Sequence, residues 1–234
     1  ALKLGVAGGM SLQRGVAERW QAQMGVPLVE GYGLTEAAPI VCANRVDVQA
    51  FSGDIGLPLP STTVAILGEE GQPLPPGAVG EIAVQGPQVM RGYWNRPDET
   101  ALAFTRDGWL RTGDIGTMHA DGSIRFVERS KDVIVVSGFK AYPSEIEEVA
   151  LRLPGVLEAA AIGVPDRHSG EAVKLFLVRQ DPKLDAASVR AHCRASLAPY
   201  KVPKSVEFRD SLPKTPVGKI SRRVLKEQAE GMDS

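Results

Sequence analysis

Three patterns of hydrophobic and polar residues follow one another along the chain, and each predicts a different kind of structure. In the first, apolar runs over residues 2–7 and 26–29 predict two short strands on either side of a helix. Strand, helix and strand make a βαβ unit, so the polar segment 30–36 is expected as a loop at the carboxyl end of the sheet, where open α/β sheets bind ligands. The helix has an apolar stripe of Leu12, Val16, Trp20 and Met24, with Ser11 as its expected N-cap.

The second pattern, over about residues 52–126, consists of short alternating runs between turns rich in glycine and proline. Residues 63–67 and 81–84 alternate as a half-buried strand does. Residues 120–123, Ala-Asp-Gly-Ser, predict a hairpin turn between two further strands. Short strands at this spacing predict a small β-barrel or β-sandwich.

The third pattern begins at Lys131 and mixes strands with helices. Ser144 and Glu147 have the spacing of a capping box. We therefore expect an α/β part at 1–50, a β-barrel-like part at 51–130 and a small α+β domain at 131–234. In the last part, strands are expected at 156–164, 172–178 and 206–208. Two helices are expected as well, one capped by Asp185 and running to about Leu197, the other capped by Ser221 and running through Gln228.

The composition of the 234 residues disfavours several classes of function. The net charge is -1, and no polybasic run points to nucleic acid or to an anionic membrane. No apolar run is long enough to span a bilayer, and the two cysteines and three histidines lack disulfide or metal-ligand spacing. We expect a cytoplasmic protein with at most a peripheral contact to the inner membrane face. The start at Ala1, without Met and directly in a strand pattern, leads us to expect more chain upstream.

Four groups of residues can carry chemistry. Residues 31–36, Gly-Tyr-Gly-Leu-Thr-Glu, combine a ring that can stack on a base, a hydroxyl that can donate to a phosphate and a carboxylate that can hold Mg²⁺. Asp114 can accept two hydrogen bonds from a ribose diol. Arg129 and Lys131 can bind phosphate or ribose. Lys219 lies in a loop rich in proline and glycine, which can aim its ammonium at one anion.

Each group alone also has an ordinary structural interpretation. Residues 31–36 can be a glycine-rich turn, and Asp114 a turn aspartate. Arg129 and Lys131 can be solvated charges, because most charged side chains are exposed. The basic residues within 214–226 can form a solvated face or a patch for an anion.

In their order and context, the four groups resemble one known family, the adenylate-forming enzymes. The resemblance covers essentially the whole chain and corresponds to the carboxyl-terminal part of such an enzyme. Residues 108–114, Gly-Trp-Leu-Arg-Thr-Gly-Asp, and 136–147, Val-Ser-Gly-Phe-Lys-Ala-Tyr-Pro-Ser-Glu-Ile-Glu, are most similar to bacterial long-chain fatty-acid–CoA ligases. Amino-acid adenylation domains usually carry Asp where Lys131 stands, and an Arg-Gly-x-Arg type of segment near 137–140, so the departures favour a CoA ligase.

The resemblance implies a role for each candidate residue. At the nucleotide it implies adenine stacking by Tyr32 between Gly31 and Gly33, a phosphate contact by Thr35, support of Mg²⁺ by Glu36, and ribose binding by Asp114 and Arg129. In the carboxyl-terminal lid it implies a hinge at Lys131, a path for CoA along Ser137, Gly138 and Lys140, and a catalytic Lys219 that reaches the carboxylate and the α-phosphate.

The implied function is a ligase that joins a fatty acid to CoA with ATP and Mg²⁺, by way of an acyl-AMP. A ligase for an aryl, short or medium acid is an alternative within the family, and a non-catalytic interaction module that uses the basic 214–226 face is an alternative outside it. The family's upstream Ser/Thr/Gly-rich phosphate loop does not occur in this sequence. We therefore expect the chain alone to be inactive.

Overall fold

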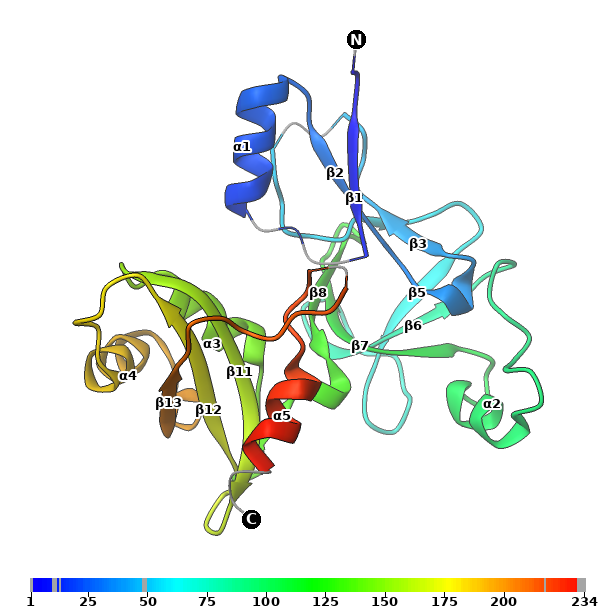
Figure 1. Ribbon diagram of the computed structural model, residues 1–234. Helices are drawn as coiled ribbons and strands as arrows, with labels where there is room; N and C mark the ends of the chain where they lie inside the picture. Colours follow the sequence, from blue (N-terminus) through cyan, green and yellow to red (C-terminus); the bar gives the residue numbers. More distant parts are fainter. Residues whose placement is uncertain (1, 10–11, 13, 48–49, 217, 231–234) are drawn as a thin grey trace. The chain divides into compact units, whose positions relative to one another are not determined.

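The structure, a computed structural model, describes two compact units, Ala1–Ser130 and Lys131–Ser234. Each unit has its own hydrophobic core. In Figure 1 the first unit runs from blue to green and the second from green through yellow to red. The residues that are described are 2–9, 12, 14–47, 50–216 and 218–230.

The first sheet of the Ala1–Ser130 unit is built on the predicted βαβ unit, which is confirmed. β1 (Gly5–Gly8) runs parallel to β2 (Leu28–Gly33), and α1 (Arg14–Met24) connects them. The expected helix cap, Ser11, lies outside the described residues. Two strands then extend the sheet in antiparallel pairs, β3 (Ile40–Ala43) on β2 and the short β4 (Leu57–Pro58) on β3.

The segment 30–36, expected as a polar loop, is mostly strand. β2 continues to Gly33 and pairs with β3. The N–H of Leu34 donates to the carbonyl of Pro39 at 2.8 Å, which closes a tight turn and folds β3 straight back onto β2. Only the 3₁₀ turn η1 (Thr35–Ala37) leaves the strand. The expected ligand-binding residues therefore lie at the end of a paired strand and in the turn after it.

Four strands of the same unit form an antiparallel meander. They are β5 (Thr63–Leu67), β6 (Val79–Gln85), β7 (Leu110–Met118) and β8 (Ile124–Arg129), and they pair in sequence order. The hairpin turn predicted at 120–123 connects β7 with β8 and is confirmed. The short helix α2 (Pro97–Ala103) lies between β6 and β7 in the chain.

The meander is an open sheet and does not close into the barrel that was expected. Among the described residues, β5 and β8 stand at opposite edges of the sheet. One face packs instead on the first sheet, because Val41 of β3 lies in the same buried cluster as Ile82 of β6 and Ile124 of β8. This packing removes the apolar face from water without closure. The two sheets thus share a core, and a further division of this unit at residue 50 stays a prediction.

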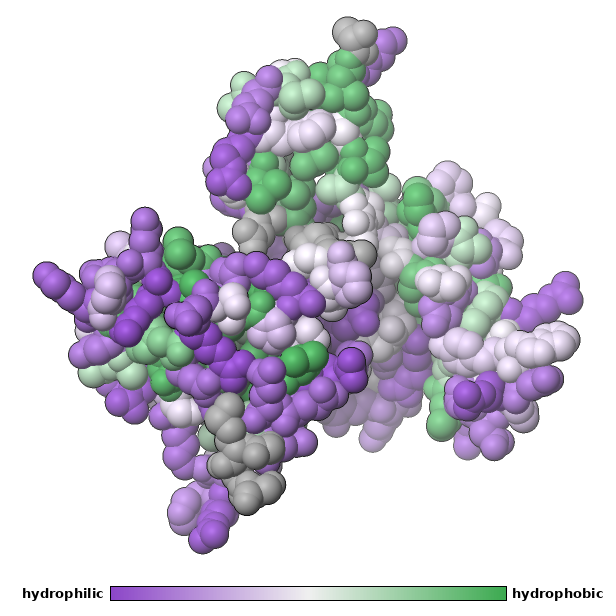
Figure 2. Space-filling model, viewed as in Figure 1, coloured by the Kyte–Doolittle hydropathy of each residue, from purple (hydrophilic) through white to green (hydrophobic). Residues whose placement is uncertain are grey.

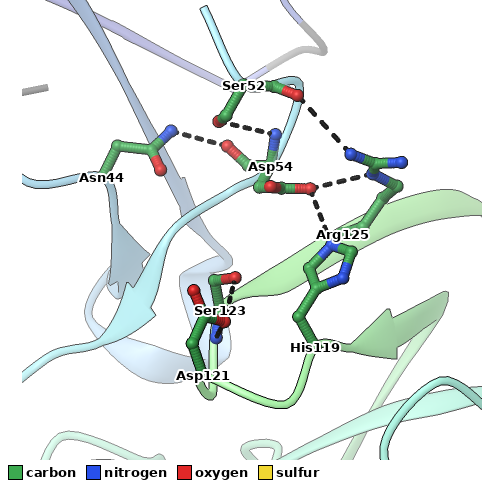
Figure 3. A network of polar contacts seen from close by, with 7 residues as sticks. All are labelled: Asn44, Ser52, Asp54, His119, Asp121, Ser123 and Arg125. Atoms are coloured by element: carbon green, nitrogen blue, oxygen red, sulfur yellow. Dashed lines mark hydrogen bonds and ion pairs between the residues drawn. The ribbon is translucent and has the colours of Figure 1, made fainter. Parts of the chain in front are cut away.

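A network of polar contacts fastens the segment before β4 to the β7–β8 hairpin (Figure 3). The carboxylate of Asp54 accepts a hydrogen bond from Nε of Arg125 at 2.8 Å and lies 3.2 Å from Nε2 of His119. The backbone of Asp54 is held as well, since its carbonyl accepts from Nδ2 of Asn44 at 2.6 Å and its N–H donates to Oγ of Ser52. Asn44 follows β3 and Arg125 belongs to β8, so the network links the two sheets of this unit.

The Lys131–Ser234 unit contains a five-stranded sheet. Its longest strands, β11 (Val156–Asp166) and β12 (Gly170–Arg179), form an antiparallel hairpin. β13 (Ser205–Phe208) runs parallel to β12. A short hairpin of β9 (Ile134–Val136) and β10 (Phe139–Ala141) pairs with the beginning of β12.

Alternation along β11 decides which helices cover each face of this sheet. Ala161 contributes to the cluster with α3 (Pro143–Leu151) and α4 (Ala186–Ser196), whereas Ile162 contributes to the cluster with α5 (Arg222–Glu230). Successive strand side chains point to opposite faces, so both faces of β11 are buried and its sequence is a nearly continuous apolar run. The predicted α+β domain is confirmed, with helices on both faces of the sheet (Figure 1).

Two of the predicted helix caps in this unit, those at Asp185 and Ser144, have different outcomes, and the cap at Ser221 stays a prediction. Asp185 caps α4 as expected, because its carboxylate accepts a backbone N–H at 2.8 Å. The capping box of Ser144 and Glu147 is wrong, since α3 begins at Pro143 and its N-cap makes no side-chain hydrogen bond. Proline at the first helical position has a preset φ and no N–H that needs an acceptor. Oε1 of Glu147 accepts instead from the N–H of Ala161, at 2.8 Å.

Exposed hydrophobic side chains of the first unit gather around β1 and α1. Val6 on β1 is 70% exposed, and Val16 and Met24 of α1 are exposed as well. Figure 2 shows hydrophobic residues around β1 at the top of the view. Among the residues that the structure describes, β1 has a strand neighbour on its β2 side only.

Within the described ranges, no helix is long enough and apolar enough to cross a bilayer.

Candidate active site

Tyr32 and Asp114 meet where β2 and β7 come together in the first unit. The hydroxyl of Tyr32 donates to Oδ2 of Asp114 at 2.7 Å, although 82 positions separate them in the chain. Burial raises the pKa of Asp114, and the hydrogen bond from Tyr32 opposes this rise. Burial and the neighbouring Asp114 carboxylate raise the pKa of Tyr32 as well, so its hydroxyl remains a protonated donor. The pair is a preformed polar contact between two strands that are far apart in the sequence.

A local irregularity of β7 turns Asp114 toward Tyr32. The pairing of β6 and β7 shifts register beside Gly113, which has a φ of +71°. The N–H of Gly113 donates to the carboxylate of Glu81 at 3.0 Å, and Thr112 Oγ1 donates to the carbonyl of Ile82 at 2.7 Å. A bulge of this kind re-aims the side chain that follows it. The positive φ of Gly113 thus explains why the 108–114 motif has a glycine at this position.

Arg129 lies directly opposite Asp114 on the neighbouring strand β8. Its Nε is 3.5 Å from Oδ1 of Asp114, and its side chain is 59% exposed. Because the pair is largely solvated on the arginine side, it contributes little to stability. The exposed guanidinium keeps donors for a ligand. The structure therefore brings together three of the predicted nucleotide residues, Tyr32, Asp114 and Arg129.

The turn after β2 carries Thr35 and Glu36. Gly33 is required before it, because a Cβ there would lie 1.9 Å from the carbonyl oxygen of Pro39. Thr35 is exposed and Glu36 half-buried in η1. Gly31, by contrast, has room for a Cβ, with its nearest neighbour at 3.7 Å. The strand pairing thus explains Gly33 and leaves Gly31 unexplained.

Two contacts of Glu36 come from a segment that the sequence patterns did not single out. The N–H of Met90 donates to the carbonyl of Glu36 at 2.8 Å. The hydroxyl of Tyr93 donates to Oε1 of Glu36 at 2.9 Å, and this hydrogen bond raises the pKa of Tyr93. The sequence feature that could have pointed to this segment is the run Arg-Gly-Tyr-Trp at 91–94, in which a glycine precedes two aromatic residues.

Glu36 and Thr35 fit the magnesium ion that the resemblance implies. Mg²⁺ is usually held by one or two carboxylates together with substrate phosphates and water, and a dedicated protein cage is uncommon. In the part of the chain that the structure describes, no group of three or more His, Cys, Asp or Glu residues forms such a cage. A single half-exposed carboxylate beside a hydroxyl is a donor set suited to a cation shared with phosphate. When bound, Mg²⁺ supplies charge neutralisation to the phosphate groups.

In the second unit, Ser137 and Gly138 form the two-residue turn between β9 and β10. Their φ values are +50° and +83°. Positive φ at both positions is the requirement of a type I′ hairpin turn, which glycine meets at no steric cost. Lys140 and Phe139 are exposed on β10, and Phe139 stacks on Tyr200 of η3 (Pro199–Lys201) with ring centroids 5.1 Å apart. The predicted CoA-side residues thus occupy an exposed, tightly defined hairpin.

Lys219 is held by a compact turn at the carboxyl-terminal end of the same unit. The N–H of Thr215 donates to the carbonyl of Lys219 at 2.7 Å, and the N–H of Lys219 donates to Oγ1 of Thr215 at 3.2 Å. Immediately afterwards Arg222 begins α5 and makes a bidentate ion pair with Glu147 of α3, with hydrogen bonds of 2.8 and 3.0 Å. The backbone of Lys219 is therefore fixed on both sides. Val217 lies outside the described residues.

Lys131 belongs to the 3₁₀ turn η2 (Ser130–Asp132), which contains the junction of the two units. Its side chain is exposed, and its carbonyl accepts a long hydrogen bond from Nζ of Lys226 at 3.4 Å. Asp132, the next residue, lies 3.6 Å from Arg222. The residue predicted as a hinge thus stands at the division between the compact units.

The fold of the two units is that of the adenylate-forming enzymes. A family model for AMP-binding enzymes matches residues 1–94, and a model for the AMP-binding enzyme C-terminal domain matches residues 145–219. The chain belongs to the family of AMP-binding enzymes.

Relatives of known name support this assignment. A long-chain-fatty-acid–CoA ligase of Escherichia coli O6:H1 is 53% identical over 231 residues, which cover 99% of this chain and 41% of the relative. A feruloyl-CoA synthase of Amycolatopsis sp. is 44% identical over 94% of this chain and 45% of the relative. The crystal structure of ATP-bound MatB from Rhodopseudomonas palustris matches with a TM-score of 0.92 and 35% identity, over 99% of this chain and 46% of that one. The chain spans less than half the length of each.

Proposed function

We propose that the chain is part of an ATP-dependent fatty-acid–CoA ligase, which converts a carboxylate, ATP and CoA into acyl-CoA, AMP and pyrophosphate. The observation that carries the proposal is the convergence of Tyr32, Asp114 and Arg129 at one place. The ring of Tyr32 suits an adenine, and the anion of Asp114 suits a ribose diol. The cation of Arg129 suits a phosphate or ribose oxygen. The similarity to the E. coli ligase supports the acid–thiol ligase class.

In this proposal the nucleotide binds through the first unit. The ring of Tyr32 stacks on adenine while its hydroxyl holds Asp114 in place. Each oxygen of an ionised carboxylate can accept more than one hydrogen bond, so Asp114 can take the ribose hydroxyls in addition to its contact with Tyr32. Thr35 contacts the α-phosphate, and Glu36 supports the magnesium ion. Gly31 and Gly33 keep this edge of β2 free of bulky side chains.

Lys219 acts in the first half-reaction. A carboxylate is a poor acyl donor, so one of its oxygens attacks the α-phosphorus of ATP and pyrophosphate leaves with the electron pair of the broken P–O bond. Negative charge builds up on the α-phosphoryl oxygens, and the ammonium of Lys219 stabilises it. Removal of one preorganised donor of this kind typically costs about 2.7–4 kcal/mol of barrier.

The second half-reaction uses another part of the Lys131–Ser234 unit. The CoA sulfur attacks the acyl carbon, the bond to the AMP oxygen breaks, and the thiol proton is released. We assign the exposed Ser137–Gly138 turn and Lys140 to CoA. Rotation about Lys131 exchanges the Lys219 turn for this hairpin, since a few residues at the end of an element can absorb a hinge motion.

The acid itself is the finer part of the proposal. A long-chain fatty acid is favoured by the similarity to the E. coli ligase, and an aryl acid is the second candidate because of the feruloyl-CoA synthase. Pyrophosphate release by the full-length protein from a panel of fatty and aryl acids decides between them. No release from any acid would favour a non-catalytic module.

The Lys219→Ala variant of the full-length protein tests the function and the mechanism together. We expect loss of acyl-AMP formation by about 10²–10³-fold, with thioester formation from supplied acyl-AMP largely kept. Arg223→Ala is the matched control, because Arg223 lies on the same basic face with its side chain 80% exposed. If the two variants reduced acyl-AMP formation equally, Lys219 would belong to a general anion-binding patch and would have no special catalytic role. Equal loss of both half-reactions in Lys219→Ala would contradict the exchange of the two loops.

A further inference from the structure

Glu36 is held from two sides by a segment far away in the sequence. Its carbonyl accepts the N–H of Met90 at 2.8 Å, and its Oε1 accepts the hydroxyl of Tyr93 at 2.9 Å. The first contact fixes the backbone of η1, and the second fixes the carboxylate. Among the residues that the structure describes, Oε2 of Glu36 accepts no hydrogen bond. The carboxylate is thus oriented by one oxygen while the other remains available.

Tyr93 is itself anchored by the helix α2. Its N–H donates to Oγ1 of Thr100 at 2.9 Å, and this hydroxyl donates onward to the carbonyl of Arg96 at 2.8 Å. Gly92 makes the approach possible, because a Cβ there would lie 2.6 Å from Cγ2 of Thr100. A chain of contacts therefore runs from α2 through Tyr93 to Glu36. Such a chain holds Tyr93 at its backbone N–H and at its hydroxyl, although the residue is 39% exposed.

We propose that Tyr93 is a positioning residue for Glu36. The hydroxyl of Tyr93 holds Oε1 of Glu36, so that Oε2 faces the divalent cation that accompanies ATP. The proposal rests on the role of Glu36 in the proposed function. Partners that orient a ligating carboxylate commonly alter metal affinity or activity by about 10–100-fold when they are removed. Because Tyr93 and Glu36 are both partly solvated, we expect the lower end of this range.

The test is Tyr93→Phe in the full-length protein, since phenylalanine keeps the ring and removes only the donor. With Mn²⁺ as the probe and ATP present, electron paramagnetic resonance should show a dissociation constant for Mn²⁺ raised by about ten-fold. The kcat for acyl-AMP formation should fall, while KM for the acid stays unchanged. Trp94→Phe is the control, because Trp94 is the adjacent aromatic residue and is 90% exposed; it should leave both quantities unaltered.

A second variant separates positioning from general stability. Thr100→Val removes the acceptor for the Tyr93 N–H and should weaken Mn²⁺ binding less than Tyr93→Phe does. Combined with Tyr93→Phe it should cause no further loss, because it acts only through Tyr93. The role of Tyr93 would be overturned if Tyr93→Phe bound Mn²⁺ as tightly as an active wild type does. Fully additive losses of Mn²⁺ affinity in the double variant would overturn it as well. A wild type that forms no acyl-AMP would instead refute the proposed function.

Discussion

At the residue scale, Asp114 is the side chain on which the candidate nucleotide site depends most. It is 6% exposed, and the fold supplies two partners, Tyr32 from β2 and Arg129 from β8. Burial disfavours the carboxylate anion, whereas the two partners favour it. In the proposed function a ribose diol donates to this carboxylate, and the anion is its stronger acceptor. We therefore expect the balance among these effects to set the pH range in which the nucleotide binds.

Replacement of Tyr32 by Phe tests that balance. The substitution keeps the ring and removes the donor to Asp114, so the pKa of Asp114 should rise further. A hydrogen bond to a charged group contributes about 1.5–3 kcal/mol, and we expect KM for ATP to increase by roughly ten-fold or more at neutral pH. The acid limb of a plot of KM for ATP against pH should move to higher pH. An unchanged limb would show that Asp114 does not carry the nucleotide contact.

Residue types with a chemical role could be predicted from the sequence, but their partners could not. Lys219 stands out because its ammonium occurs in a loop rich in proline and glycine, and Asp114 because a carboxylate follows Gly113; the sequence placed Asp114 at the end of a strand, whereas it lies in the middle of β7. Tyr93 escaped notice because its contact with Glu36 spans 57 positions and leaves no local pattern. The Ser144–Glu147 capping box was wrong for a related reason: Glu147 is bound to Arg222 and to the β11 backbone, both distant in sequence.

At the element scale, local periodicity predicted most strands and helices, while their pairing depended on non-local contacts. The βαβ unit, the β7–β8 hairpin and α4 were found because alternation, a turn sequence and a cap are local signals. The open form of the β5–β8 sheet was not, because whether a sheet closes depends on what else can cover its apolar face. Here the strand β3 does so, through Val41. Likewise the strand character of Gly31–Gly33 depends on β3 as a partner.

The role of α5 in the second unit can be tested with two variants of the chain 1–234. Leu225 is fully buried against the β11–β12 face, so Leu225→Ala should lower the free energy of unfolding of this unit by about 2–5 kcal/mol. Glu227→Ala on the same helix should change it by less than about 0.5 kcal/mol, because Glu227 is exposed and pairs with the exposed Arg223. Urea denaturation followed by circular dichroism provides the measurement. A similar loss in both variants would show that α5 is held by something other than its buried face.

At the scale of the whole molecule, the chain contains the two family matches but less than half the length of its relatives. The first unit holds the candidate nucleotide residues, and the second holds Lys219 and the Ser137–Gly138 turn. We expect purified 1–234 to form no acyl-CoA at a useful rate, because its sequence contains no Ser/Thr/Gly-rich phosphate loop. An assay of ATP-dependent thioester formation, with the full-length protein as control, checks this. Robust turnover by 1–234 would contradict it.

The junction between the units leads to a prediction about the hinge. Lys131 lies in η2 at the point where one compact unit gives way to the other, and its side chain is exposed. If its backbone torsions matter more than its charge, Lys131→Pro and Lys131→Ala should differ in the full-length protein. Proline fixes φ near −65° and restricts the residue before it, whereas alanine removes only the ammonium.

We therefore expect Lys131→Pro to spare one half-reaction and to block the other, and Lys131→Ala to keep both. Pyrophosphate release reports the first half-reaction, and thioester formation from supplied acyl-AMP reports the second. The comparison is informative because both half-reactions need a folded protein, so a selective loss cannot come from unfolding. Equal rates of both half-reactions in the proline variant would place the hinge elsewhere. A selective loss in the alanine variant as well would show that the Lys131 ammonium itself takes part.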